Sequence, residues 1–260
     1  MVGGLRRIDL GEAERLLYPV IPAFITSEFK GRVGGMLAAW WTQLSFKPFL
    51  VGVAIASERF TYKLVRSSGV FALNLLDFKY FDRTPLLGDV SERFYPGKLK
   101  AAGFTIVKGE VLGAPIVLEA TAALELTLTN VIETGDHDLF IGEVKAAYAR
   151  EEFKGLWDLR LYKPIMYLGR TRRPDVVRRV YVTFKDVDVR ELEYAPGPLK
   201  EYSNLRFKVL EEVEEAVKRL SSKSLEEKLQ AIARILESHG LDPGDAEYYL
   251  EEVKRRLLQS

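Results

Sequence analysis

The chain of 260 residues contains no cysteine and only two histidines, His137 and His239. Without cysteine, the sequence excludes disulfides, thiolate catalysis, and zinc or iron–sulfur centres held by cysteine. Two histidines are too few for a metal site built from several histidines of one chain. We therefore expect no metal centre.

Long apolar runs and an excess of one charge are also missing. No stretch reaches about 18 consecutive apolar residues, so no membrane-spanning helix is expected. Residues 1–17 lack the apolar segment and cleavage site of a signal peptide. The net charge of +1 gives no basic footprint for nucleic acid. The sequence thus predicts a cytoplasmic protein without a membrane or nucleic-acid partner.

Glutamine and asparagine are scarce, with three of each, while 29% of the residues are charged. This combination is typical of thermophiles. The hydrophobic fraction of 47% is that of a soluble globular protein. The length suits one large domain with an appendage.

Short strand patterns fill the first two thirds of the chain. They cover residues 20–27, 34–45, 49–56, 70–76, 104–108, 122–131, 139–144 and 164–168. Helices are expected over 11–18 and 60–68, with Gly69 as the stop of the second, and mixed helix and loop over 77–102. Many short strands with few helices indicate a mainly β fold, an antiparallel barrel with helical decorations.

The character changes beyond residue 172. Residues 178–189 read as a strand pair or an extended arm, and 194–198 have the composition of a linker. Helical patterns follow over 200–220, 224–238 and 243–258, the second opened by a capping box of Ser224 and Glu227. His239 is interpreted as a helix-end residue. The predicted parts are 1–171, an arm or linker over 172–199, and a helical extension over 200–260.

One stretch, Gly34–Ser45, is unusual for a plain strand. It combines two glycines, the adjacent Trp40 and Trp41, and the hydroxyls of Thr42 and Ser45. The two tryptophans could be core residues of two packed faces. The same groups would also suit a flat aromatic ligand with a polar tail. The stretch alone leaves both interpretations open.

Motifs elsewhere in the chain, taken in order with this stretch, resemble one family. They are Gly35–Pro48, Arg59–Tyr62, Gly69–Leu75, Lys98-Leu99 ahead of Ala102–Phe104, Pro115–Ala120, Gly135–His137 with Gly142–Val144, and Pro164–Gly169. Residues 12–169 are similar to the flavin reductase-like, FMN-binding split barrel family. That family includes NAD(P)H:flavin oxidoreductases, flavoredoxin and archaeal ferric reductase.

The resemblance implies a split β-barrel that binds FMN, with FAD as the alternative, along the backbone of residues 36–40. Trp40 would contact the flavin and Trp41 would pack behind it. Thr61 and Lys98 would bind the phosphate. Asn74 would form hydrogen bonds with the ribityl chain, or only with backbone groups at a strand end. The implied cofactor-binding residues are Leu37, Ala38, Ala39, Trp40, Thr42, Ser45, Thr61, Asn74, Lys98, His137 and Tyr167.

The resemblance also implies an activity. The chain would be an FMN-dependent oxidoreductase that passes hydride from NAD(P)H through flavin to free flavin, a ferric complex or a partner protein. His137 would be the catalytic residue, placed to stabilise the charge of reduced flavin. The alternative is a flavin-binding electron carrier or dimeric scaffold without NAD(P)H turnover, whose C-terminal helices recruit a partner. Either would be a homodimer with flavin at the interface.

Overall fold

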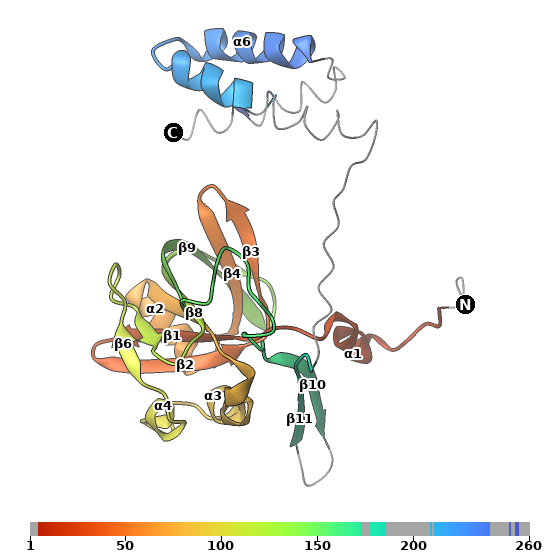
Figure 1. The fold of residues 1–260 in the computed structure, drawn as a ribbon, viewed down its shortest axis with the longest axis vertical. Coiled ribbons are helices and arrows are strands. Elements are labelled where there is room, and N and C mark those ends of the chain that lie inside the picture. The colour runs from red at the N-terminus through yellow and green to blue at the C-terminus, as the bar shows by residue number, and fades with distance from the viewer. Residues whose placement is uncertain are drawn as a thin grey trace. The chain divides into compact units, whose positions relative to one another are not determined.

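The computed structural model describes residues 5–172, 177–185, 209, 211–239, 250 and 253–254 (Figure 1). The chain forms two compact units, Met1–Asp188 and Val189–Ser260. Among the described residues, no helix is long and apolar enough to cross a membrane.

The first unit is built mainly of strands. Its strands are β1 (Ala23–Phe29), β2 (Arg32–Ala38), β3 (Trp41–Phe46), β4 (Phe49–Ala56), β5 (Val70–Leu75), β6 (Ile106–Lys108), β7 (Pro115–Val117), β8 (Ala122–Glu133), β9 (His137–Ala149), β10 (Met166–Arg172) and β11 (Val177–Val182). Its helices are α1 (Leu10–Ala13), η1 (Glu14–Leu17), α2 (Phe60–Ser68), η2 (Phe78–Arg83), α3 (Thr84–Asp89) and α4 (Lys98–Ala101). The predicted strand 49–56 and helix 60–68 are confirmed at both ends, and Gly69 ends α2 in the left-handed conformation.

Seven antiparallel strands form one sheet in the order β2-β1-β5-β8-β9-β4-β3. Its two end strands, β2 and β3, are joined by only Ala39 and Trp40. A flat sheet would separate them by about 29 Å at the usual strand spacing, whereas the link spans at most about 11 Å. The sheet must therefore curl into a barrel. A hydrogen bond from the Ala54 N–H to the Trp40 carbonyl, 2.9 Å long, ties the link to β4.

This closure corrects one sequence prediction. The stretch Gly34–Ser45 was expected to form a single strand, but the structure divides it into the two end strands of the sheet. Ala38 ends β2 and Ala39 begins the link, so only methyl side chains stand where the chain leaves the first strand.

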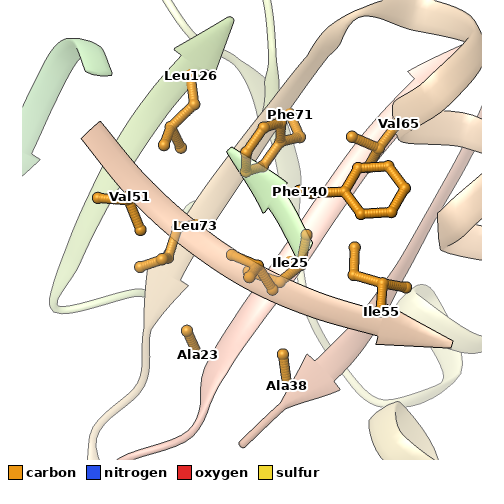
Figure 2. Packing of buried hydrophobic residues seen from close by; sticks show 11 residues of the cluster. Ala23, Ile25, Ala38, Val51, Ile55, Val65, Phe71, Leu73, Leu126 and Phe140 are labelled. Atoms are coloured by element: carbon orange, nitrogen blue, oxygen red, sulfur yellow. The ribbon is translucent and has the colours of Figure 1, made fainter. Parts of the chain in front are cut away.

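The barrel encloses one apolar cluster, and a second cluster lies on the other face of β1. Ile25 points into the first cluster, together with Phe71, Leu73 and Phe140 (Figure 2). Its neighbour Phe24 joins Leu87, Leu99, Phe104 and other residues of the second cluster. The alternation along β1 thus fixes α3, α4 and the β6–β7 pair to the outside of the barrel.

Glu125 is a fully buried carboxylate on β8. Burial alone would raise its pKa. Hydrogen bonds from the Tyr148 hydroxyl and from the N–H groups of Val111, Leu112 and Ala114 outweigh that effect and lower the pKa. Glu125 therefore organises the connection between β6 and β7 as an ionised acceptor.

The second unit contains a helix over residues 211–219 and α6 (Leu225–Ser238). Val209, Val213, Ile232 and Leu236 are buried together between them. The predicted capping box of Ser224 and Glu227 is confirmed. His239 caps the end of α6, as expected, and its Nε2 lies 2.9 Å from Glu212. Of the predicted helix over 243–258, residues 250, 253 and 254 are described and are helical; the rest of it and most of the predicted linker fall outside the described residues.

Candidate functional site

A cleft of about 340 Å³ opens on the first unit where the link between β2 and β3 faces the β10–β11 hairpin. We call one side the barrel wall; it comprises Met36–Trp40, Ala54, Asp136 and His137. The opposite side, the hairpin wall, comprises Gly88, Tyr167, Gly169, Arg179 and Tyr181. Glu14, Arg15, Tyr18 and Pro22 from the N-terminal segment, with Arg59, complete the lining.

The barrel wall is built on main-chain pairing. β4 runs between β3 and β9, and its end pairs Ala56 with His137. The Trp40 carbonyl accepts a hydrogen bond from Ala54, which precedes Ala56 by two residues on β4. The Trp40 and His137 rings therefore meet, with centroids 4.7 Å apart. Trp40 is 45% exposed. An aromatic surface with an imidazole beside it therefore faces the cleft.

The His137 ring is held in one orientation. Its Nδ1 lies 2.8 Å from the carboxylate of Asp136, which can only accept, so Nδ1 carries a hydrogen. The same interaction lowers the pKa of Asp136. In the neutral ring, Nε2 is then the atom left to exchange a proton with a molecule in the cleft.

Aromatic rings dominate the hairpin wall. β10 and β11 pair Tyr167 with Tyr181, and their rings lie 5.3 Å apart. Tyr18 meets Tyr167 edge-on at 5.6 Å. Two backbone hydrogen bonds between Val20 and Tyr167 fix the N-terminal segment to β10. Tyr167 is only 9% exposed, so its ring is held from both sides.

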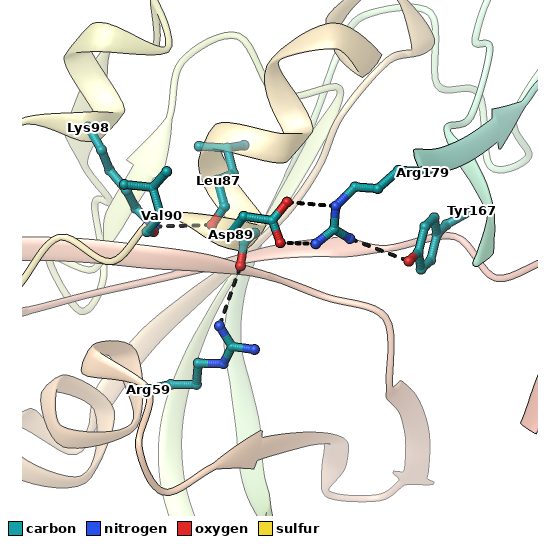
Figure 3. Close-up of polar contacts among 8 residues, drawn as sticks. Arg59, Leu87, Asp89, Val90, Lys98, Tyr167 and Arg179 are labelled. Carbon is teal, nitrogen blue, oxygen red and sulfur yellow. Dashed lines mark hydrogen bonds and ion pairs between the residues drawn. The ribbon is translucent and has the colours of Figure 1, made fainter. Parts of the chain in front are cut away.

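Three cations hold the end of α3 in place (Figure 3). The Lys98 ammonium donates to the carbonyls of Leu87 and Val90 at 3.0 and 2.6 Å. Arg59 donates to the Gly88 carbonyl at 3.5 Å. Arg179 makes a two-pronged ion pair with Asp89, with its Nε 2.7 Å from Oδ2, and also donates to the Tyr167 hydroxyl at 3.3 Å. Every residue from Leu87 to Val90 is thus held by a cationic side chain.

The cleft suits a flat ring with an anionic tail. Arg15 and Arg59 line it, and guanidinium groups bind phosphate in a fixed geometry. The guanidinium of Arg179, also in the lining, is engaged with Asp89 and Tyr167. Arg59 also stands at the N-terminal cap of α2, where unpaired backbone N–H groups favour an anion. Ala38 and Ala39 have small side chains and Gly88 has none, so a ligand can approach the backbone closely at these positions. The volume lies at the lower end of the range for ligand sites, about 300–1,000 Å³. The chemistry of this lining fits a flavin nucleotide.

Six of the residues predicted from the sequence lie together in this cleft: Leu37, Ala38, Ala39, Trp40, His137 and Tyr167. Trp41 lies outside it, packs against the barrel core and donates its indole N–H to the Ile21 carbonyl at 2.7 Å. The ambiguous Gly34–Ser45 stretch therefore combines both interpretations, because one tryptophan faces the cleft and the next faces the core.

The structure gives Asn74 and Lys98 roles other than the predicted binding of flavin. Asn74 is fully buried; its amide donates to the Phe24 carbonyl and Thr26 hydroxyl, and accepts from the Val117 N–H at 2.9 Å. These bonds join β5, β1 and β7, so its function is structural. Lys98 is 2% exposed and points to the end of α3. Burial lowers its pKa to about 8.

Thr42, Ser45 and Thr61 do not line the cleft either. Thr42 is exposed on β3, where its hydroxyl donates to the Gln43 carbonyl at 3.3 Å. Ser45 lies opposite Leu50 farther along the same hairpin. Thr61 is 2% exposed within the first turn of α2. Arg59, two positions earlier in the same motif, does reach the cleft.

Sequence reasoning missed the arginines and Asp136. Arg59 and Asp136 belong to motifs that were recognised, and their charge next to a predicted ligand was the available signal. Arg179 had no such signal, since only the pairing of β10 with β11 brings it to the cleft.

Comparison with known proteins agrees with this geometry. The model of the flavin reductase like domain matches residues 15–174. An uncharacterized protein of Aeropyrum pernix is 58% identical over 253 residues, covering 97% of this chain and 95% of the relative. An uncharacterized protein of Pyrococcus abyssi is 36% identical over 145 residues, which is 55% of this chain and 83% of the relative.

Solved structures share the fold. Flavoredoxin from Methanosarcina acetivorans superimposes with a TM-score of 0.62 at 22% identity, covering 75% of this chain and all of that one. An FMN-binding protein from Thermus thermophilus, solved with 1-cyclohex-2-enone, gives 0.57 at 29% identity, covering 73% and 100%. Because the family model spans more than half of the sequence, the chain belongs to the flavin reductase-like family.

Proposed function

We propose that the chain binds FMN in the cleft and passes hydride from NAD(P)H through the flavin to an acceptor. The observation that carries the proposal is the cleft itself, which sets Trp40 and His137 opposite Tyr167 and places Arg15 and Arg59 at its edge. Family membership supports a flavin-related redox function. The similarity to an FMN-binding protein at 29% identity supports FMN, with FAD as the alternative.

Different residues of the cleft would bind the ring and the phosphate and exchange a proton. The backbone of residues 36–40 would orient the ring, since its small side chains allow close approach. Arg59 and the N-terminus of α2 would hold the phosphate. Bound flavin would supply a two-electron acceptor for hydride. His137, oriented by Asp136, would hold or release a proton at Nε2 beside the ring.

Flavin binding and turnover can be tested separately. The purified chain should change the visible spectrum of added FMN and quench its fluorescence. Mixing the loaded protein with NADH or NADPH in a stopped-flow instrument should bleach the flavin band within seconds. Absence of any flavin binding would refute the proposal at its first step.

A second function is favoured by the helical unit, which lies beyond the residues matched by the family model. The chain would then be an electron carrier or scaffold whose helices recruit a partner. This function predicts FMN binding without bleaching by either nicotinamide, and reduction only by a redox partner. The acceptors to compare in the first case are free flavin, a ferric complex and a redox protein.

We also propose that the cleft is completed by a second copy of the chain. Large apolar side chains are exposed in the N-terminal segment beside the cleft and on strand β3. The exposed fractions are 72% for Leu16, 78% for Leu17, 43% for Leu44 and 84% for Phe46. Burying these side chains would be favourable, and a two-fold contact is the commonest way to do so. Light scattering at micromolar concentration should give twice the chain mass; a monomer would contradict this proposal.

A further inference from the structure

The hairpin wall includes a strand that the family match does not cover. The match ends at residue 174, whereas β11 begins at Val177 and contributes Arg179 and Tyr181 to the cleft. This wall therefore contains residues that lie beyond the part of the chain matched by the family model.

Arg179 makes more directed contacts than a solvated surface arginine. Its Nε and one terminal nitrogen bind both oxygens of Asp89, and the other terminal nitrogen reaches the Tyr167 hydroxyl. The Arg179 side chain is 17% exposed, against 47% for Asp89. All three guanidinium nitrogens are thus used, and the planar fork leaves little freedom to either partner.

These contacts join three segments that are far apart in sequence. Asp89 ends α3, Tyr167 lies on β10 and Arg179 lies on β11. Next to Asp89, Gly88 faces the cleft, and a methyl group added there would come within 3.8 Å of Leu37 on the barrel wall. Gly88 therefore lies close to the barrel wall and leaves room in the cleft that a side chain would occupy.

We infer that Arg179 is a positioning residue of the cleft, which fixes Gly88 and Tyr167 against a bound flavin by holding Asp89 and the Tyr167 hydroxyl at once. The inference rests on the proposed FMN binding for its functional consequence. Its structural part, the fixing of α3 to the hairpin, holds with or without flavin.

The test uses the full-length chain, with FMN as the probe. Arg179→Ala and Asp89→Asn should each weaken FMN binding by about ten-fold, because removing a supporting ion pair beside a ligand loosens the whole wall. The double variant should bind no more weakly than the weaker single variant, since both changes break one interaction. Arg179→Lys keeps the charge without the fork and should restore little of the affinity.

Arg160→Ala is the matched control. Arg160 makes the same two-pronged pair with Asp158, at 2.8 and 2.7 Å, but neither residue lines the cleft. It should leave the FMN affinity within two-fold of the wild type. An equal affinity for Arg179→Ala and Arg160→Ala would overturn the inference. Full recovery by Arg179→Lys would also overturn it, because charge alone would then suffice.

Hydrogen exchange of the flavin-free chain separates this inference from the proposed function. In Arg179→Ala, the amides of residues 84–90 should exchange faster than in the wild type and in Arg160→Ala. If the wild type binds no FMN, the proposed function fails while faster exchange still supports the positioning role. Unchanged exchange over residues 84–90 would rule that role out.

Discussion

The two walls of the cleft are built by different means. The barrel wall is held by main-chain pairing, in which Trp40 is bonded to Ala54 and β4 pairs with β9. The hairpin wall also contains main-chain pairing, between β10 and β11 and between Val20 and Tyr167, but its attachment to α3 depends on side-chain interactions between residues about 90 positions apart. Main-chain pairing survives most substitutions, whereas an interaction between two side chains can be removed by changing either one. The hairpin wall is therefore where we expect binding properties to be adjustable without loss of the fold.

The largest expected difference is in stability, between substitutions of Gly35, which adjoins the barrel wall, and Gly88 of the hairpin wall. A methyl group at Gly35 on β2 would stand 2.7 Å from the Ile25 carbonyl and 2.8 Å from the Phe24 ring. Gly35→Ala should therefore cost about 2–3 kcal/mol in the free energy of unfolding, as overpacking of a core does. Gly88→Ala meets only Leu37 at 3.8 Å and should change stability by less than about 1 kcal/mol. Urea denaturation measures both.

For FMN affinity, we expect the larger effect from Gly88→Ala rather than from Gly35→Ala. Gly88→Ala narrows the cleft and should weaken FMN binding while the protein remains folded. Equal losses of stability in the two variants would contradict the division between a barrel-supported wall and an adjustable one.

His137 tests what the barrel wall contributes beyond shape. His137→Ala should lower kcat for flavin reduction by NAD(P)H about ten-fold or more, because the variant has no positioned proton carrier. The Kd for FMN should change less than about three-fold. His239→Ala, in the second unit, is the matched control and should leave both constants unchanged. A larger effect on Kd than on kcat would make His137 a binding residue only.

The pH dependence of stability tests the role of Lys98, which holds the end of α3 beside the hairpin wall. Its pKa falls from 10.5 in the free side chain to about 8 in the folded chain because of burial, with Glu92 opposing and Arg59 reinforcing the shift. Between these values the unfolded chain binds more protons than the folded one, so stability rises with pH over about 8 to 10.5. The stability advantage of the wild type over Lys98→Met should therefore widen from pH 7.5 to 10, by about 2 kcal/mol. A constant difference across this range would show that Lys98 titrates normally.

Salt should have the smallest effect. Raising NaCl from 0.05 to 0.5 M should weaken FMN binding about three-fold, since the arginines at the cleft edge are partly exposed to solvent. In Trp40→Ala the same factor should remain, because this change removes only an uncharged group. Fluorescence titrations at the two salt concentrations measure the ratio of the two Kd values for FMN. If Trp40→Ala abolished the salt effect, the effect could not come from the arginines.

Local signals in the sequence predicted part of this site. The continuous apolar run 49–56, the helix 60–68 with its glycine stop, and the ordered motifs around Trp40 and His137 all lie within short segments. The strand and the helix are confirmed, and Trp40 and His137 do lie in the cleft, because each of these features depends on neighbours in the chain. The motifs also indicated the family, and with it the barrel.

Interactions between distant segments could not be read in the same way. Asn74 and Lys98 look like ligands in a motif, but burial directs their polar groups to backbone carbonyls of β1 and α3. The break at Ala39–Trp40 follows from closure of the sheet, which no local pattern expresses. Arg179 reaches the cleft only because β11 folds back on β10.

The sequence by itself thus determined the mainly β character, the strand over 49–56, the aromatic stretch and the family. Its hydrophobic alternation and turn residues act over a few positions, so they are visible without the fold. The tertiary structure decided which tryptophan faces the cleft, which cations line it and how the hairpin wall is held. Those choices depend on which surfaces are buried when the sheet closes, and burial is a property of the whole barrel.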